Sequence, residues 1–234
     1  MKLDIAPPAS ESAAKRPRGR PRKTVDERDD GNRRLALLST AAKLFRRKGF
    51  AATTTRDIAA AAGMQSGSPF YHFKSKDALL YAVMEEGMRS ALARQRAAAS
   101  VPGYASLKPA DQLWLLVKVH FDVLLGPGSD FVPVMLYEAR SLSPRQHKAL
   151  GQLTAEYEAL WLPVLTALHT SGELQAPVRL ARLLILGALN WSVQWFDAKK
   201  GASLQELTEA AMDLFLKPCG TDPELRSNSV RSSN

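Results

Sequence analysis

The sequence predicts an all-α protein of about nine helices, because apolar residues recur at helical spacing between breaks rich in Pro and Gly. No segment alternates apolar and polar residues with the two-residue period of a strand, and no internal repeat occurs. The chain has 234 residues and is 45% apolar, which is enough to form a buried core.

The first helix is expected at about residues 32–48. Its last turn carries three basic residues, which suit the negative end of the helix dipole, and Gly49 follows as a stop signal. Residues 1–30 are rich in Pro and charge and have few apolar side chains. They predict a disordered arm, because they cannot bury enough surface to offset ordering.

The second helix is expected at about residues 55–62, ended by Gly63. Thr54 lies three residues before Asp57, which is the spacing of a capping box. The side chains expected to face the first helix are Ile58 and Ala61 or Ala62.

A short third helix is expected at about residues 66–72, and Ser75 can cap a longer fourth helix at 76–98. The fourth helix carries a long apolar stripe, which predicts burial along its length. The stripe consists of Leu79, Leu80, Val83, Met84, Met88, Ala91 and Leu92.

Three helices follow before residue 171. Pro109 suits the first turn of a helix at 109–125, which the sequence "GPG" stops. The next helix is expected at 131–142. Ser143 and Pro144 then open a helix that runs to about residue 170, with a kink at Pro163.

The last two helices are expected at residues 177–200 and 204–216. The first of them is apolar on nearly every side in its middle, and the second starts with the capping box Ser203 to Glu206. The polar tail at 218–234 is expected to be disordered.

The net charge of +9 lies in the first third of the chain. Residues 1–34 carry +4, residues 35–76 carry +6 and residues 77–234 carry −1. This distribution predicts that a small N-terminal module meets a polyanion. The most basic run, "KRPRGRPRK", has no apolar residue, which favours nucleic acid over a membrane surface.

The two short helices on either side of Gly63 predict a helix-turn-helix within a DNA-binding domain at 31–76, followed by a second domain at 77–217. In such a module the later helix enters the major groove, and its polar side chains reach base edges while neighbouring donors bind phosphates. The residues expected to serve these two purposes are Gln65, Ser66, Ser68, Tyr71, His72, Lys74 and Lys76, while Gly67 lets the backbone approach the DNA closely. Phe70 and Phe73 have no polar handle and are expected to face inward.

The string "AAKLFRRKGFAATTTRDIAAAAGMQSGSPFYHFKSKDALL", residues 41–80, resembles the DNA-binding domain of the tetracycline-repressor (TetR) family of bacterial regulators, and the resemblance covers residues 35–80. The motifs "LF...GF", "TT.RDIA..AG" and "YHF.SK" all fall in place. The resemblance implies phosphate contacts from Thr54, Tyr71, His72 and Lys76, and a groove-facing role for Gln65, Ser66 and Ser68. This chain has Ser68-Pro69 where the family usually has a Thr-Leu pair, which allows the third helix to start one or two residues later.

Beyond residue 80, "EYEALW" and "LGALNWSVQWF" resemble a branch of the family that responds to fatty-acyl or acyl-CoA ligands. The resemblance implies an effector cavity among the helices of the second domain. The residues expected to line it are Met84, Met88, Trp114, Phe121, Met135, Arg140, Tyr157, Trp161 and Trp191, with His120 and Asn190 as further polar candidates. For each of them, ordinary core packing or a surface position is the alternative.

The last two helices predict a homodimer interface, because the helix at 177–200 is too apolar for a lone surface helix and its partner at 204–216 is amphipathic. The family resemblance implies the same arrangement, with burial inside one subunit as the alternative. The predicted function is therefore a homodimeric repressor on a palindromic double-stranded DNA operator, released by a small apolar effector such as an acyl-CoA or fatty acid.

The segment at 16–23, "RPRGRPRK", resembles an AT-hook, in which Arg18 and Arg20 would enter a narrow A·T minor groove. The alternative is a basic arm that holds phosphates by charge alone. An architectural protein that binds A·T-rich DNA through this arm is accordingly the competing function.

Several classes of protein are disfavoured. The sequence has no G-x-S-x-G motif and no phosphate-binding glycine loop, so an enzyme is not expected, and neither is a cofactor. One cysteine, Cys219, and four scattered histidines make neither a disulfide nor a metal site. Without a long apolar run or the apolar core of a signal peptide, a cytoplasmic protein that does not bind membranes is expected.

Overall fold

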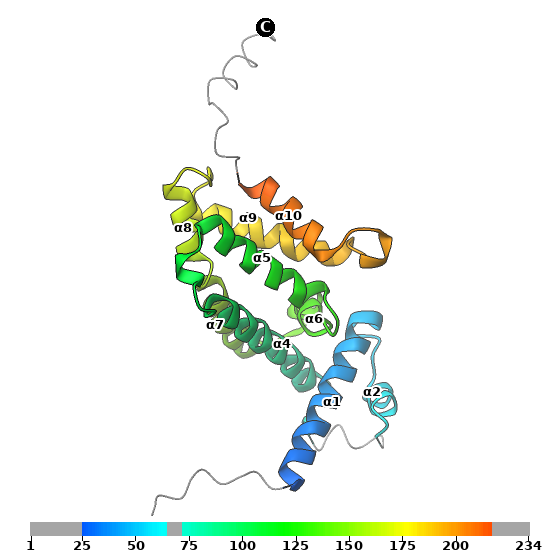
Figure 1. Ribbon diagram of the computed structural model, residues 1–234. Coiled ribbons are helices and arrows are strands. Elements are labelled where there is room, and N and C mark those ends of the chain that lie inside the picture. Colours follow the sequence, from blue (N-terminus) through cyan, green and yellow to red (C-terminus); the bar gives the residue numbers. More distant parts are fainter. Residues whose placement is uncertain (1–24, 65–71, 217–234) are drawn as a thin grey trace, which may run out of the picture.

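The computed structural model describes residues 25–64 and 72–216, with side chains from residue 31 onward. Every regular element in these ranges is an α-helix or a short 3-10 helix, which confirms the predicted all-α fold. The helices form two lobes, a small one that contains α1 and α2 and a larger C-terminal bundle (Figure 1).

The first helix, α1 (Val25–Lys48), starts seven residues before the predicted position. The sequence of the added turns, "VDERDD", is rich in acidic residues, which favour the positive N-terminal end of a helix dipole. Part of the segment expected to be a disordered arm is therefore helical. Gly49 ends the helix as predicted, with a φ of 81° that only glycine adopts readily.

The second helix, α2 (Thr55–Ala61), has the predicted capping box between Thr54 and Asp57. Ile58 is fully buried, as expected. Of the two alternatives for its companion, Ala62 is partly buried and packs against the core, whereas Ala61 is exposed. Ala59 is buried as well, which was not predicted from the sequence.

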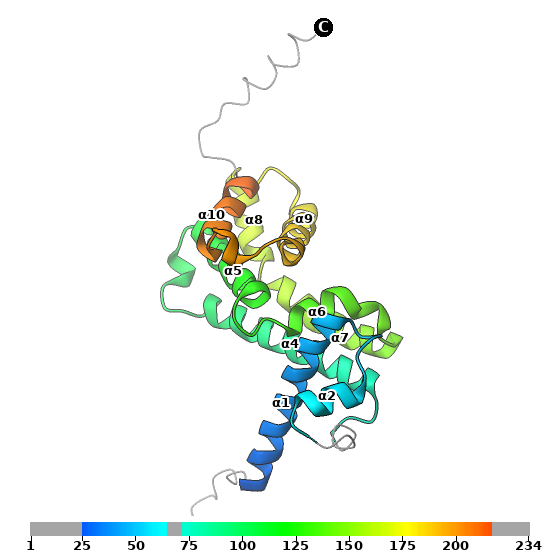
Figure 2. The same cartoon turned by 90° about the vertical axis from the view of Figure 1, so that its right-hand side faces the viewer.

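The fourth helix, α4 (Lys76–Ala99), begins where Ser75 accepts a hydrogen bond from the Ala78 N–H. All residues of the predicted apolar stripe are buried. This helix leads out of the N-terminal lobe into the larger lobe, where it packs against α5 (Pro109–Leu125), α6 (Phe131–Glu138) and α7 (Pro144–Ala159) (Figure 2).

Three of the predicted helices are shorter than expected. The helix expected at 131–142 ends at Glu138 and tightens into the 3-10 turn η2 (Ala139–Ser141). The helix expected at 144–170 is divided into α7 and α8 (Leu162–Thr170), with a break where a kink was expected. Pro163 explains the break, because its ring would clash with the carbonyl of the residue four positions earlier, where α7 ends.

The long helix expected at 177–200 also ends early, as α9 (Val178–Trp191). The hydroxyl of Ser192 donates to the Leu189 carbonyl at 2.6 Å, a local bond that competes with helix continuation. The 3-10 turns η3 (Ser192–Gln194) and η4 (Ala198–Lys200) follow. The last helix, α10 (Leu204–Phe215), has the predicted capping box and packs on α5.

Candidate functional site

The loop between α1 and α2 is fixed by the first residue of α4. The Lys76 ammonium donates to the carbonyls of Phe50, at 2.9 Å, and Thr53, at 3.0 Å. It also lies 4.2 Å from the centre of the Phe50 ring, within the range of a cation–π contact. The Phe50 ring packs edge-on against Phe45 of α1. Lys76 thus ties the start of α4 to the loop between α1 and α2.

The same loop is held from its other side by α6. The Phe50 N–H donates to the Glu138 carboxylate at 2.8 Å. At the opposite end of α6, Asp130 accepts a hydrogen bond from the Arg46 guanidinium of α1 at 3.1 Å. Both ends of α6 therefore bind the C-terminal part of α1 and the loop after it.

A cavity lies where α4, α5, α6, α7 and α9 meet. Its free volume is about 70 Å³, which holds a few water molecules or a short hydrocarbon segment. The lining is mostly apolar, with polar groups on α5, α7 and α9. The lining residues are Met88, Ala91, His120, Val123, Leu124, Val132, Met135, Thr154, Tyr157, Glu158, Leu186 and Asn190.

A buried chain of hydrogen bonds forms one wall of this cavity. The Gln95 side-chain amide donates to the Leu116 carbonyl at 2.9 Å and to the Tyr157 hydroxyl at 2.8 Å. The Tyr157 hydroxyl lies 2.8 Å from Nδ1 of His120. All three side chains are at least 94% buried, so their hydrogen bonds are not weakened by competing water.

Burial keeps this wall uncharged at neutral pH. It lowers the pKa of His120 to about 4, with a smaller opposing effect from the Asn190 side chain. It also raises the pKa of Tyr157 well above the ordinary value. Trp161 packs at a right angle against the His120 ring, with the ring centres 5.8 Å apart, and fixes its orientation. Glu158, which also lines the cavity, forms an ion pair with Arg182.

Comparison with known proteins agrees with this two-part architecture. Residues 37–83 match the family described as "Bacterial regulatory proteins, tetR family", and residues 106–219 match "Tetracyclin repressor-like, C-terminal domain". Together the two matches cover most of the chain. The chain belongs to the TetR family. It is a DNA-binding transcriptional regulator, as the sequence predicted.

Three relatives illustrate the range of this TetR protein's similarities. It is 28% identical to the transcriptional repressor KstR2 of Rhodococcus jostii over 194 residues, which covers 82% of this chain and 93% of the relative. It is 38% identical to the solved structure of the superantigen PfiT, covering 81% of this chain and 97% of that one with a TM-score of 0.64. The structure of AibR with isovaleryl coenzyme A and operator DNA has a TM-score of 0.71 at 20% identity, covers 80% and 99% of the two chains, and shares the fold.

The predicted DNA-contacting residues of this TetR protein fall into two groups. Thr54 is exposed at the start of α2, and His72 is half-buried beside Phe73, which is buried as expected. Lys76 is engaged with the α1–α2 loop, a structural role that the sequence did not indicate. The other candidates lie outside the described residues: Arg18, Arg20, Gln65, Ser66, Gly67, Ser68 and Tyr71. Phe70, which was expected to face inward, also lies outside them.

The predicted pocket residues are only partly brought together. Met88, Met135 and Tyr157 line the cavity, and so do the further candidates His120 and Asn190. Met84, Phe121 and Trp161 are buried in the surrounding core, and Trp114 is half-buried; none of these four lines the cavity. Arg140 is exposed on η2, and Trp191 is 65% exposed on α9, so neither faces the cavity.

Sequence reasoning missed most of the apolar lining and also Gln95. Ala91 follows Met88 by three residues, and Val123 and Leu124 follow His120 by three and four, so helical spacing from the correct candidates would have found them. Gln95 continues the apolar stripe of α4, and a polar residue in such a position is itself a signal of a buried hydrogen bond.

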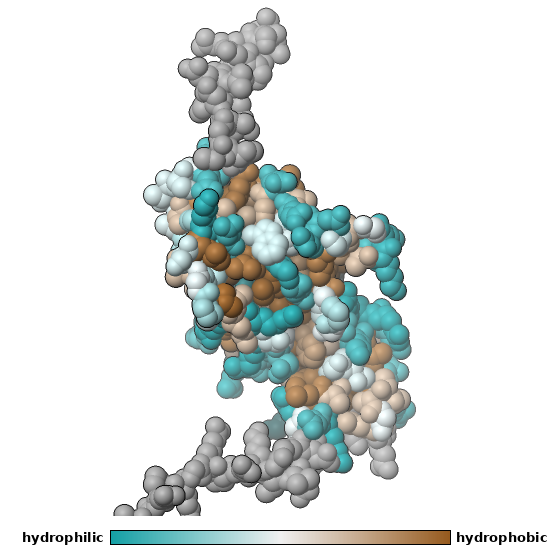
Figure 3. All heavy atoms as spheres, in the orientation of Figure 1, coloured by the Kyte–Doolittle hydropathy of each residue, from teal (hydrophilic) through white to brown (hydrophobic). Residues whose placement is uncertain are grey.

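The outer face of the C-terminal helices exposes a row of large apolar side chains. On α9 they recur at helical spacing, and Gly187 lies among them with open space around it. The exposed residues are Leu180, Leu183, Leu184 and Trp191 on α9, with Trp195 and Leu214 nearby along the chain. Apolar surface is also visible on the half of the molecule formed by α5, α8, α9 and α10 (Figure 3).

Two structural absences hold within the ranges 25–64 and 72–216. No helix there is long and apolar enough to cross a membrane. No cluster of three or more His, Cys, Asp or Glu side chains there is placed to hold a metal ion.

Proposed function

We propose that this chain is a cytoplasmic, homodimeric transcriptional repressor that binds a near-palindromic operator. A small apolar effector of the acyl-CoA or fatty-acid type dissociates it from the operator. Repression is inferred from the likeness to KstR2. The mainly apolar cavity between helices supports the choice of effector.

The observation that carries the proposal is the double role of α6. Val132 and Met135 of this helix line the cavity, while Asp130 and Glu138 at its two ends bind α1 and the α1–α2 loop. A ligand that widens the cavity must displace lining helices, because the observed volume is smaller than that of a typical ligand site. Displacement of α6 then changes the position of the DNA-binding module.

α4 provides a second connection along the same route. Met88 and Ala91 line the cavity, and Lys76 at the start of the same helix holds Phe50. Phe50 thus receives one bond from α4 and gives one to α6. In a dimer, a rotation of this module alters the separation of the two recognition helices, on which binding to two half-sites depends.

A dimer is required by the size of the DNA-binding module. One recognition helix reads only a few base pairs, so useful specificity needs two. The exposed apolar row of α9, with Trp195 and Leu214, is the proposed interface. In each subunit, Gln65, Ser66 and Ser68 would read bases, and Thr54, Tyr71 and His72 would bind phosphates.

Capture of sheared genomic DNA from the source organism by the purified protein tests the DNA-binding part. The truncated comparison protein should start at residue 25, because a start at residue 31 would cut into α1. We expect both proteins to enrich the same few palindromic sites. Enrichment of mainly A·T-rich tracts, and only by the full-length chain, would instead support an architectural protein that uses its basic arm.

Release is tested on the enriched sites with octanoyl-CoA and octanoic acid as probes, at constant ionic strength. We expect at least one probe to lower operator affinity and leave binding to random DNA unchanged. Gln65→Ala should change the sequence preference, whereas Tyr71→Phe should weaken binding to all sequences alike. If neither probe nor any shorter acyl homologue changes operator affinity, the proposed effector class is wrong.

A further inference from the structure

The hydrogen-bond chain Gln95–Tyr157–His120 determines which nitrogen of His120 carries the proton. The Leu116 carbonyl can only accept, so the Gln95 group that faces it must be the NH₂. The second hydrogen of that NH₂ then goes to the Tyr157 oxygen. The Tyr157 hydroxyl proton remains to be donated to Nδ1 of His120.

The opposite arrangement, with Nδ1–H donating to Tyr157, leaves more polar groups unsatisfied. The Tyr157 hydroxyl proton would then have no acceptor among the described residues, and Nε2 of His120 would be a bare acceptor without a partner. In the first arrangement only one of these two groups, the Nε2–H, is unsatisfied, and Oε1 of Gln95 lacks a partner in either arrangement. Because each buried unpaired group costs about 1–3 kcal/mol, the Nε2–H tautomer is favoured.

Nε2 is therefore a hydrogen-bond donor in the cavity wall. No described residue lies within hydrogen-bond distance of it, although the Asn190 side chain is close enough to raise the pKa of His120. The His120 side chain is 94% buried. Nδ1 faces Tyr157, so Nε2 lies on the side of the ring away from Tyr157, beside the cavity that His120 and Asn190 both line. Nε2 itself has almost no accessible surface, so a ligand reaches it as the cavity widens. The imidazole cannot turn freely, because Tyr157 holds one edge and Trp161 packs against the ring.

We propose that His120 anchors the effector, with Nε2–H donating a hydrogen bond to an uncharged carbonyl oxygen of a ketone, ester or thioester whose apolar part occupies the cavity. The inference deepens the proposed function, on which it rests, by selecting the chemical class of the ligand. Met88 and Met135 provide the adaptable lining that admits chains of different length.

A free carboxylate fits this site poorly. An anion in a dry wall needs a cation, but the pKa of His120 of about 4 leaves only about one imidazole in a thousand protonated at pH 7. The nearby Arg182 guanidinium is already paired with the Glu158 carboxylate. The site thus discriminates an acyl ester or thioester from the acid that hydrolysis would produce.

The free protein tests the tautomer directly. Imidazole resonances of the ¹⁵N-histidine-labelled full-length chain distinguish Nδ1–H from Nε2–H, and the His120→Phe variant identifies the signal of His120. We expect the Nε2–H tautomer from pH 6 to 8. A dominant Nδ1–H tautomer for His120 would overturn the proposal without any ligand.

Binding is tested with the ketones 2-butanone to 2-decanone, the alkanes of matching length and the corresponding fatty acids. We expect a ketone to shift the Nε2 resonance and to bind about tenfold more tightly than its matched alkane. His120→Phe should abolish that preference. Thr154→Val is the matched control, because the Thr154 hydroxyl is already bonded to the Leu150 carbonyl and should not contribute.

The outcomes separate the two proposals. If no ketone shifts the His120 signal, or if ketones and alkanes bind equally to the wild-type chain, the anchor is wrong, whatever happens on DNA. If an effector still releases the His120→Phe variant from the operator, and binds that variant as tightly as the wild-type chain, the proposed function stands and the anchor fails. If ketones bind through His120 but neither they nor any acyl probe affects DNA, the anchor stands and the effector response fails.

Discussion

At the scale of single residues, Lys76 has a structural use in addition to its predicted phosphate contact. Replacing it with Met removes two hydrogen bonds from an ammonium group and the contact with the Phe50 ring. We expect a loss of about 2 kcal/mol in the free energy of unfolding. Urea unfolding measures this loss, and Lys74→Met, an exposed neighbour with the same change of charge, is the control. Equal stability of the two variants would contradict the structural role of Lys76.

His120 makes stability depend on pH. Its folded-state pKa of about 4 lies below the unfolded value near 6.5, so the unfolded chain binds more protons between these values. The stabilising contribution is complete above pH 6.5 and is lost as the pH falls toward 4, by at most about 3 kcal/mol. Urea unfolding of the wild-type chain and of His120→Gln at pH 7.5 and 5 should show a smaller decline for the variant. Parallel declines would rule out this contribution.

At the scale of elements, the close contact of α4 with α6 is the structural basis of the proposed coupling. A Cβ atom at Gly87 of α4 would lie 2.9 Å from the Phe131 Cβ and 3.2 Å from the Phe131 backbone carbon, so the two helices would have to separate. Gly87 permits the approach because it lacks a side chain, and its packing role outweighs the cost of a glycine within a helix.

Two glycine substitutions separate packing from helix propensity. Gly87→Ala should destabilise the protein by about 1–2 kcal/mol, because overpacking exceeds the gain in helix propensity. Gly151→Ala, in α7 with open space around it, should stabilise it by about 0.5–1 kcal/mol. Thermal or urea unfolding measures both. A Gly87→Ala variant that is as stable as the wild-type chain, or more stable, would mean that α4 and α6 are not as tightly packed as the distances indicate.

At the scale of the whole molecule, the exposed apolar row of α9 needs a covering surface. Leu184 is 68% exposed and Trp191 is 65% exposed, and a contiguous row of such side chains is a mark of an interface. We expect Leu184→Glu to raise the dimer dissociation constant about 100-fold, because it would bury an unpaired charge. Sedimentation equilibrium measures the mass, against a monomer of 25.6 kDa.

The control for this variant is Ala93→Glu, which adds the same charge to the exposed face of α4. It should leave the mass of the assembly unchanged. Leu184→Glu should lower the affinity for the operator because fewer dimers are present, whereas Ala93→Glu should leave that affinity unchanged. A Leu184→Glu protein that keeps the wild-type mass would place the dimer interface elsewhere.

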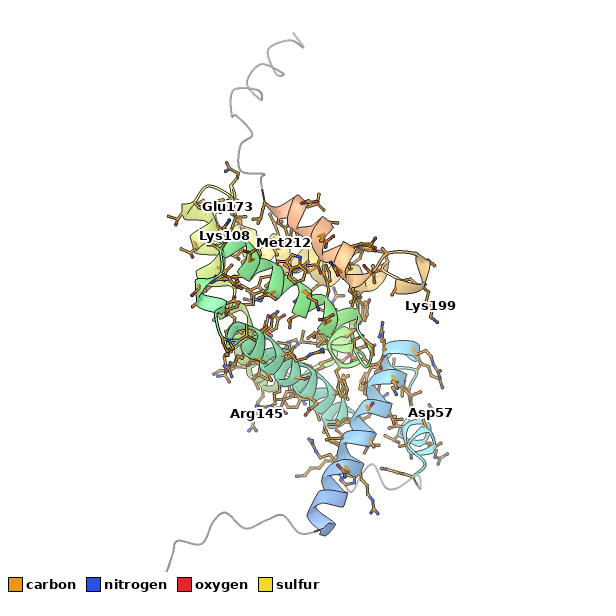
Figure 4. All side chains as sticks on the ribbon, in the orientation of Figure 1. Asp57, Lys108, Arg145, Glu173, Lys199 and Met212 are labelled. Carbon is orange, nitrogen blue, oxygen red and sulfur yellow. The ribbon has the colours of Figure 1, made fainter. Side chains whose placement is uncertain are left out.

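Helices with strong terminal signals were predicted closely from the sequence. Pro109 and the stop "GPG" bound α5, Ser75 caps α4, and the Ser203 capping box starts α10. Asp57, labelled on α2 in Figure 4, closes the capping box that Thr54 begins. These signals act within a few residues of the chain, so the sequence by itself determined the all-α fold, the helix-turn-helix module and membership of the TetR family.

Tertiary structure alone decided which of the predicted pocket residues meet. Tyr157 reaches Gln95 across 62 residues and His120 across 37, and no local pattern encodes such a pairing. Trp191 and Tyr157 are both large aromatic residues and were both predicted to line the pocket. Trp191 instead lies on the outer face of α9, because the packing of neighbouring helices sets which face of a helix turns inward. Local hydrogen bonding and steric exclusion fix where helices begin and end, whereas packing between distant helices fixes what they enclose.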